Sequence, residues 1–136
     1  MSNYSARKIH TFTVSMSNTP GEIHKIYQCL REGNISIIAS SAAISGFSNG
    51  YSVFCTQENA GARSLLQKGG WNFTEGYTCC VEGENTPGAY EEVLRKIADN
   101  GINLNSTTAQ GCGDRFSATF FVEDSAVQKL CSALNC

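Results

Sequence analysis

The tetrapeptide Asn-Thr-Pro-Gly occurs twice in this chain, at residues 18–21 and again at residues 85–88, an offset of 67 residues. The same offset places one set of apolar residues on another, and both sets have the spacing i, i+3, i+4, i+7 of one helix face. The chain therefore contains an internal duplication, in which each copy has a turn that leads into an amphipathic helix. The two sets are Ile23, Ile26, Tyr27 and Leu30, and Tyr90, Val93, Leu94 and Ile97.

Each copy predicts the element order β-α-β-β-α-β, from alternating or apolar runs that Gly, Asn and Pro interrupt. In the first copy we expect strands at 10–16, 35–43, 51–57 and 71–74, a helix at 21–32, and a second helix that Asn59 caps and that ends at Lys68. In the second copy we expect strands at 77–81, from 102 and at 116–122, a helix at 88–99, and another after Asp124-Ser125.

The second copy is predicted to lack its last strand. The repeat alignment places Cys136, where the sequence ends, opposite Trp71, where the last strand of the first copy begins. A missing strand leaves a sheet edge open, and an open edge invites pairing. We therefore expect a homodimer, with residues 1–8 as a segment that can cover an edge.

Composition and charge exclude few functions but disfavour some. The chain has 136 residues, of which 41% are hydrophobic, enough for one ordinary domain or two small ones. Its formal net charge is −2 and Lys and Arg form no cluster, so neither nucleic acid nor an anionic membrane is an expected partner. The sequence shows no apolar run of membrane-spanning length and no signal peptide, which predicts a cytoplasmic protein.

Seven cysteines are many for such a chain, but their number is odd and none are spaced as Cys-x-x-Cys. We interpret them mainly as buried small hydrophobic residues in a reducing compartment. Cys79 and Cys80 are adjacent and point to opposite sides of a strand, so together they make a poor chelate. No metal and no cofactor are therefore predicted.

An enzyme is not predicted either, because no catalytic constellation is visible. The two histidines are His10 and His24, and His24 lies beside the apolar face of its predicted helix, where solvent exposure is expected. Cys29 is five residues away along that helix, outside the i+3 or i+4 reach that a Cys/His pair needs. No Ser/His/Asp set, phosphate loop or carboxylate pair is present.

The two β-α-β-β-α-β units, each with an Asn-Thr-Pro-Gly turn before an amphipathic helix and a Gly/Asn-Ile sequence after it, resemble ACT domains. The resemblance implies an α+β fold of two ferredoxin-like units packed side by side, with one ACT domain at 9–75 and a second at 76–136. It also implies a stand-alone, non-catalytic regulator that binds a free amino acid and acts allosterically, with a metabolic enzyme as a candidate partner. The polar run 103–110 departs from the family pattern and makes the first copy the favoured ligand site.

The chemistry of the turn supports a ligand site on its own terms. Proline fixes φ near the start of the helix, glycine allows close approach, and the unpaired first-turn N–H groups suit a carboxylate. The side chains of Asn18 and Asn85, or of Thr19 and Thr86, can cap the helix or bind a polar ligand group. The resemblance adds the start of the second strand, where carbonyl oxygens suit an ammonium group. The predicted ligand-binding residues are Asn18, Thr19, Pro20, Gly21, Glu22, Asn34, Ile35, Asn85, Thr86, Pro87, Gly88, Ala89, Ile102 and Asn103.

Other interpretations remain open at this point. Asn-Thr-Pro-Gly is also a good strand-to-helix turn without any ligand, and Glu22 is also a first-turn acid that the helix dipole stabilises. The alternative function is a scaffolding ACT protein that has lost its ligand and acts through oligomerisation or a partner enzyme. A metallochaperone or an RNA-binding module can share the same layout, but the first would need cysteines in the turn and the second exposed aromatic residues with basic neighbours.

Overall fold

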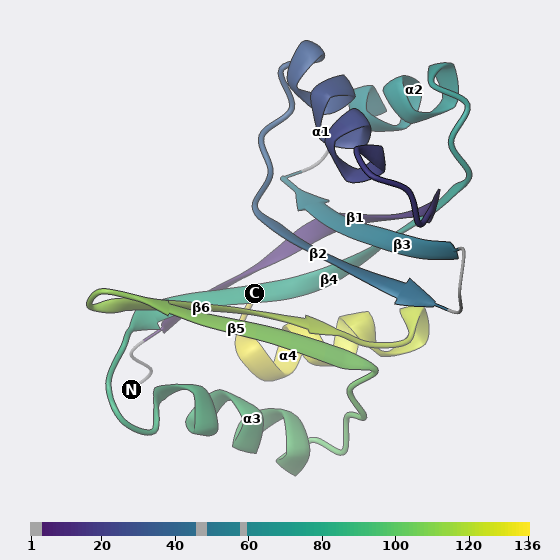
Figure 1. Cartoon of the computed structure of the whole chain (residues 1–136). Helices are drawn as coiled ribbons and strands as arrows, with labels where there is room; N and C mark the ends of the chain where they lie inside the picture. The colour runs from purple at the N-terminus through teal and green to yellow at the C-terminus, as the bar shows by residue number, and fades with distance from the viewer. Residues whose placement is uncertain (1–3, 46–48, 58–59) are drawn as a thin grey trace. The chain divides into compact units, whose positions relative to one another are not determined.

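The computed structural model describes residues 4–45, 49–57 and 60–136 (Figure 1). The strands follow the order β2-β3-β1-β4-β6-β5, and the pairs β1–β3, β2–β3, β4–β6 and β5–β6 are antiparallel. Asn59 and the tip of the β2–β3 hairpin lie outside the described residues. The elements are β1 (Tyr4–Ser17), α1 (Glu22–Glu32), β2 (Ala39–Ser45), β3 (Asn49–Thr56), α2 (Ala60–Lys68), β4 (Phe73–Glu84), α3 (Ala89–Asp99), β5 (Ser106–Cys112), β6 (Arg115–Phe121), a 3-10 turn (Asp124–Ala126) and α4 (Val127–Leu134).

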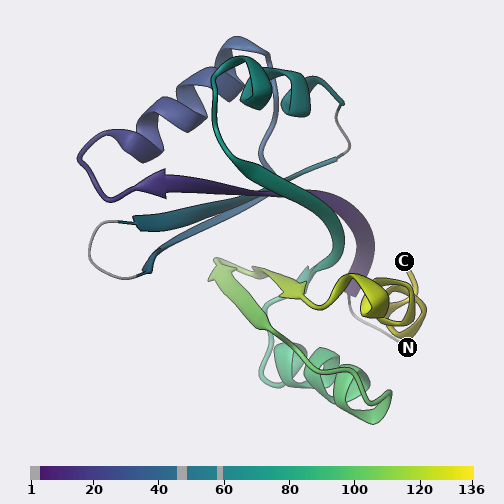
Figure 2. The same cartoon turned by 90° about the vertical axis from the view of Figure 1, so that its right-hand side faces the viewer.

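The chain divides into two compact units, and β1 and β4 each contribute to both. The first unit is His10–Gly76, and the second combines Met1–Ile9 with Tyr77–Cys136. Within the first unit the strand order is β2-β3-β1-β4, and within the second it is β5-β6-β4-β1. In each unit both helices cover one face of that unit's strands (Figure 2).

The fourth strand of the second unit comes from the N-terminal half of β1. The second copy of the repeat provides only β4, β5 and β6 among the described residues, and β1 is the neighbour of β4. Tyr4 and Ala6 pack against the core of this unit, and Lys96 Nζ lies 3.0 Å from the Tyr4 hydroxyl oxygen and 4.7 Å from the centre of the Tyr4 ring. A segment that precedes the repeat therefore occupies the edge that the repeat pattern leaves open.

The predicted helix faces form the two cores. Ile26 and Leu30 of α1 are fully buried against β1 and β3, and Val93 and Ile97 of α3 are buried in the equivalent way in the second unit. Ile23 departs from this pattern, because 44% of its surface is exposed. Trp71 packs at the margin of the first core, which confirms its interpretation as a core aromatic residue.

Several strand boundaries differ from those predicted. The expected strands at 71–74 and 77–81 are one continuous strand, β4, and the strands expected from 35 and from 102 begin only at Ala39 and Ser106. The cause of the later start is the end of the preceding helix. The N–H groups of Ile35 and Ile102 bond to the carbonyl oxygens of Leu30 and Ile97, at 3.0 and 3.2 Å, so these residues still close the helix.

Among the helices that the structure describes, none combines the length and the apolar content that crossing a membrane requires.

Candidate functional site

The two Asn-Thr-Pro-Gly turns have nearly identical backbones. Gly21 has φ +85° and ψ −5°, and Gly88 has φ +83° and ψ −3°. In each turn the N–H of the residue after glycine bonds to the threonine carbonyl, from Glu22 to Thr19 at 3.3 Å and from Ala89 to Thr86 at 3.1 Å. This is the geometry of a type II turn, which favours proline at its second position and requires glycine or asparagine at its third.

The turn geometry corrects the predicted capping. The N-cap position is occupied by Gly21 and Gly88, and the helices begin one residue later, so Asn18, Asn85, Thr19 and Thr86 are not N-caps. The two prolines likewise belong to the turn and not to the first helical position. Glycine wins the cap because the turn needs a left-handed residue there, and that backbone requirement outweighs the gain from a side-chain cap.

The second turn is attached to the hairpin between β5 and β6. Asn85 donates its backbone N–H to the Asp114 carbonyl at 2.9 Å and its side-chain amide to the Gly113 carbonyl at 3.3 Å. A Cβ atom on Gly111 would lie 2.7 Å from Asn85 Nδ2, so the close approach of this side chain depends on glycine. Asn85 therefore has a structural role in holding the turn against the hairpin.

Two hollows open on the second turn, within the second unit. Their volumes are about 110 and 250 Å³. Both include Thr86, Gly88, Ala89 and Phe116. The smaller is also lined by Tyr4, Pro87 and Glu92, and the larger by Asn85, Tyr90, Glu91, Ala109, Gln110 and Gly111.

Sequence reasoning missed the part of this lining that comes from other elements. Tyr4 belongs to β1, Gln110 to β5 and Phe116 to β6, so the tertiary fold alone brings them to the turn. The polar run 103–110 ends in β5, an edge strand of the second unit whose residues are all exposed, and this accounts for its composition.

Hydrogen bonding leaves part of the α3 N-terminus available. Ala89 and Glu92 donate their backbone N–H groups to the carbonyls of Thr86 and Gly88. The N–H groups of Tyr90 and Glu91 have no hydrogen-bond partner within the described residues. They also lie at the positive end of the helix dipole, so this end of α3 can accept a negatively charged group.

The charges around the two turns differ. Glu22 lies at the first helical position of α1, with its Oε2 atom 3.8 Å from Lys25 Nζ, so a carboxylate already offsets the positive end of that helix. The equivalent residue in the second turn is Ala89, which carries no charge. Glu91 pairs with Arg95 at 2.6 Å, and Glu92, which lines the smaller hollow, has no ion-pair partner in the described part of the chain.

The other predicted ligand residues lie at the far ends of the helices. Asn34 and Ile35 follow the C-terminus of α1, and Ile102 and Asn103 follow that of α3. An 11-residue helix separates each pair from the turn of its own unit, and 11 residues at about 1.5 Å each span roughly 16 Å. Within one unit the structure therefore does not bring these residues to the turn.

A charged cluster in the first unit was also missed. His10 is buried, with Nε2 2.9 Å from Glu75 Oε1, and Arg63 donates two hydrogen bonds to the same carboxylate, at 2.6 and 2.8 Å. The hydrogen bonds from Arg63, together with that from His10, lower the pKa of Glu75 to about 2. His24 is exposed, as expected.

Four cysteines are buried, which agrees with their interpretation as small hydrophobic residues: Cys55, Cys79, Cys80 and Cys131. The tertiary fold also brings together three thiols that are distant in sequence, those of Cys79, Cys131 and Cys136. Burial raises the pKa of Cys79 above its ordinary value, and burial together with a hydrogen bond from Cys131 raises the pKa of Cys136 to about 11. These thiols are therefore protonated near neutral pH.

Comparison with known proteins identifies the fold. No protein-family model and no curated protein sequence matches the chain. Among solved structures, protein BT0572 from Bacteroides thetaiotaomicron matches with a TM-score of 0.80 and 16% identity, over 98% of this chain and 90% of that one. The ligand-free regulatory subunit of aspartate kinase from Thermus thermophilus matches with a TM-score of 0.71 and 15% identity, over 97% and 94%. The aspartokinase alpha and beta subunits match with a TM-score of 0.66 and 13% identity, over 99% of each chain.

The chain therefore has the α+β fold of tandem ACT regulatory domains, along its full described length. The predicted ACT fold is confirmed, and the likeness to BT0572 and to the aspartate kinase regulatory subunit extends to nearly the whole of each of those chains.

Proposed function

We propose that this chain is a non-catalytic regulatory protein that binds a free amino acid at its second Asn-Thr-Pro-Gly turn. The observation that carries the proposal is the pair of hollows on that turn, which share Gly88 and Ala89 and adjoin the unpaired N–H groups of α3. The fold of known regulatory subunits supports the same class of function.

Size and charge favour a small zwitterion as the ligand. Drug-sized ligands occupy pockets of roughly 300–1,000 Å³, and the two hollows, at about 110 and 250 Å³, are smaller. The N–H groups of Tyr90 and Glu91 bind the ligand carboxylate, as helix N-termini commonly do. The carboxylate of Glu92 binds the ammonium group in the smaller hollow.

The second turn is a better site than the first because of one residue. At the first turn Glu22 repels an incoming carboxylate, whereas Ala89 leaves the equivalent position of the second turn uncharged. This choice reverses the preference that the sequence gave for the first copy. The proposed ligand residues are Asn85, Thr86, Pro87, Gly88 and Ala89 from the prediction, with Tyr90, Glu91 and Glu92 added.

A ligand that also touches Ile102 or Asn103 needs a second ACT unit, because α3 separates these residues from the turn of their own unit. Binding of this kind couples ligand occupancy to assembly. The ligand then shifts an equilibrium between two assembly states, by as much as its affinity for the two states differs. A homodimer and a regulated metabolic enzyme are the proposed partners.

Exchange of Ala89 tests the proposed site directly. Ala89→Glu places in the second turn the residue that the first turn already has, so the backbone accommodates it and the helix dipole stabilises it. It should abolish amino-acid binding without lowering the melting temperature. Ala89→Gln has nearly the same size and no charge, so it should bind more tightly than Ala89→Glu, and Glu22→Ala should leave binding unchanged. Equal loss of binding in the Gln and Glu variants would mean that steric exclusion, not charge, controls the site, and unchanged binding in Ala89→Glu would place the ligand elsewhere.

The alternative is a scaffolding protein that binds no amino acid. Four large hydrophobic side chains favour it, because each exposes more than 40% of its surface: Ile23, Ile44, Tyr51 and Tyr77. Such side chains suit protein partners. Failure of every amino acid to bind, together with a partner recovered through these residues, would support this alternative.

A further inference from the structure

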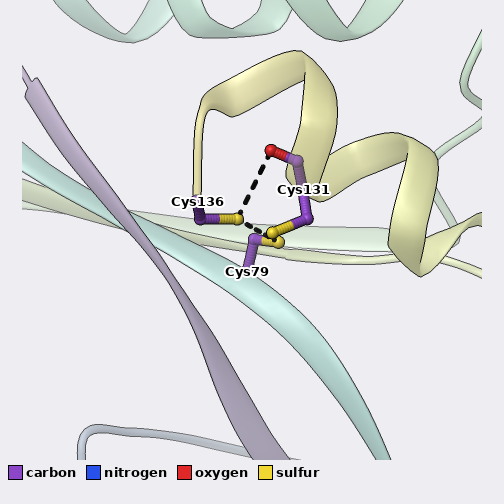
Figure 3. Close-up of side chains that lie close together, drawn as sticks. All are labelled: Cys79, Cys131 and Cys136. Carbon is purple, nitrogen blue, oxygen red and sulfur yellow. Dashed lines mark hydrogen bonds between the residues drawn. The ribbon is translucent and has the colours of Figure 1, made fainter.

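Three cysteine side chains converge in the second unit, away from the proposed amino-acid site. Cys79 comes from β4, Cys131 from α4, and Cys136 from the residues after α4. Their sulfur atoms all lie within 4.8 Å of one another, and the Sγ atoms of Cys79 and Cys136 are 3.0 Å apart. Figure 3 shows the three thiols pointing toward a common centre between the strand and the helix.

The end of α4 produces this convergence. Asn135 has φ +65° and ψ +45°, a left-handed conformation that turns the chain back under the helix. The N–H of Cys136 then bonds to the carbonyl of Cys131 at 3.0 Å, and the Cys136 thiol lies 3.6 Å from the same oxygen. Cys79 is fixed independently, because β4 pairs it with Phe120 in the core of the unit.

The spacing of the sulfur atoms suits a metal ion. Three points that lie within 4.8 Å of one another fit inside a circle whose radius is no more than about 2.8 Å, so one position is within that distance of all three sulfurs, compared with a Zn–S bond of about 2.3 Å. Sub-ångström movements of the side chains therefore complete three bonds. Cys79 and Cys131 are buried and Cys136 is exposed, which gives an ion a route from solvent and leaves room for water as a fourth ligand.

We propose that Cys79, Cys131 and Cys136 bind one thiophilic divalent cation of the Zn²⁺ type through three thiolates. Each thiol loses one proton to solvent as its metal–sulfur bond forms, and neither the metal nor the sulfur changes oxidation state. Thiolate sulfur selects such soft cations over Mg²⁺ and Ca²⁺, which prefer oxygen ligands. The ion links β4 to the C-terminal end of α4 and stabilises the second unit.

The test is titration of the full reduced chain with Zn²⁺, and separately with Co²⁺, whose thiolate charge-transfer absorption reports sulfur ligation. We expect one ion per chain, release of protons in proportion to the thiols ligated, and a higher melting temperature with Zn²⁺ but not with Mg²⁺. Cys136→Ser should abolish the Co²⁺–thiolate absorption, and it is the mildest ligand variant because Cys136 is exposed. Cys112→Ser, which removes an exposed thiol outside the cluster, should bind like the unchanged chain.

The helix end provides a second test that leaves all three ligands in place. Asn135→Gly keeps the left-handed conformation accessible and should retain metal binding, whereas Asn135→Val disfavours it and should weaken binding. Absence of one-to-one binding by the reduced chain would overturn the proposal. So would binding that survives Cys136→Ser or is lost in Cys112→Ser. A reduced chain that binds no metal but forms a Cys79–Cys136 disulfide on exposure to peroxide would identify the cluster as a redox pair instead.

Discussion

Replacement of the two turn glycines by alanine is the sharpest test of the duplicated turn. Gly21 and Gly88 have φ values of +85° and +83°, and a Cβ atom added to either would meet nothing within 4 Å. A substitution therefore costs backbone strain alone, without a steric clash. Because the two backbones agree within a few degrees, the same substitution should cost the same at both positions.

The magnitude follows from the left-handed backbone. Holding an alanine there costs about 1–2 kcal/mol, and loss of glycine from the unfolded chain returns about 0.4–1 kcal/mol. The net loss of unfolding free energy for Gly88→Ala is then roughly 1 kcal/mol, or a fall of about 4 °C in melting temperature. Asparagine tolerates this conformation, so Gly88→Asn should cost much less than Gly88→Ala.

Gly111 is the matched control, because its constraint is steric. A Cβ atom there would lie 2.7 Å from Asn85 Nδ2, so asparagine should be no better tolerated than alanine. The assay is denaturant unfolding of Ala and Asn variants at the three glycines. The reasoning about the turn is refuted if asparagine fails to rescue Gly21 and Gly88, or if the two turn glycines differ by more than about 1 kcal/mol, since independent sites with equal strain should agree more closely than that.

Three further outcomes are expected. The pKa of Glu75, lowered to about 2 by Arg63 and His10, gives the first unit stability that is complete above the ordinary value of 4.5 and is lost as the pH falls toward 2; Glu75→Gln should remove this loss from an acid titration followed by circular dichroism, and the idea fails if the titration is unchanged. Tyr4→Ala should lower the unfolding free energy by about 1–2 kcal/mol, because it removes the packing of β1 in the second unit and the contact with Lys96; hydrogen exchange should locate the loss in β4 and α3, and loss confined to the first unit would contradict the placement. Light scattering should give the mass of a homodimer, and a monomeric mass at micromolar concentration would argue against it.

Local patterns in the sequence were sufficient for the helices and the repeat. The spacing of Ile26 and Leu30, and of Val93 and Ile97, predicted the buried helix faces because helix periodicity depends on residues close in sequence. The turns were located correctly, but their capping was predicted wrongly. A proline-glycine pair satisfies both a helix start and a type II turn, and only the positive φ of glycine distinguishes the two.

Long-range pairing was not accessible in the same way. The strand at Tyr4–Ile9 lies in a polar segment and is held by β4, more than 60 residues away in sequence. One signal was present, because Tyr4 and Ala6 alternate with Ser5 and Arg7 as in a half-buried strand. The lining of the hollows and the cysteine cluster have no local signature, since each gathers residues from three or more distant segments.

Calorimetric titration of the twenty amino acids is the most direct test of the proposed function. The protein should first be unfolded and refolded, so that no ligand carried over from expression occupies the site. We expect at least one free amino acid to bind, to lose its binding in Ala89→Glu, and to raise the unfolding free energy by about 2.7 kcal/mol at a concentration of 100 Kd. If none of the twenty binds to the refolded chain, the second turn is a structural turn and the amino-acid-binding function is wrong.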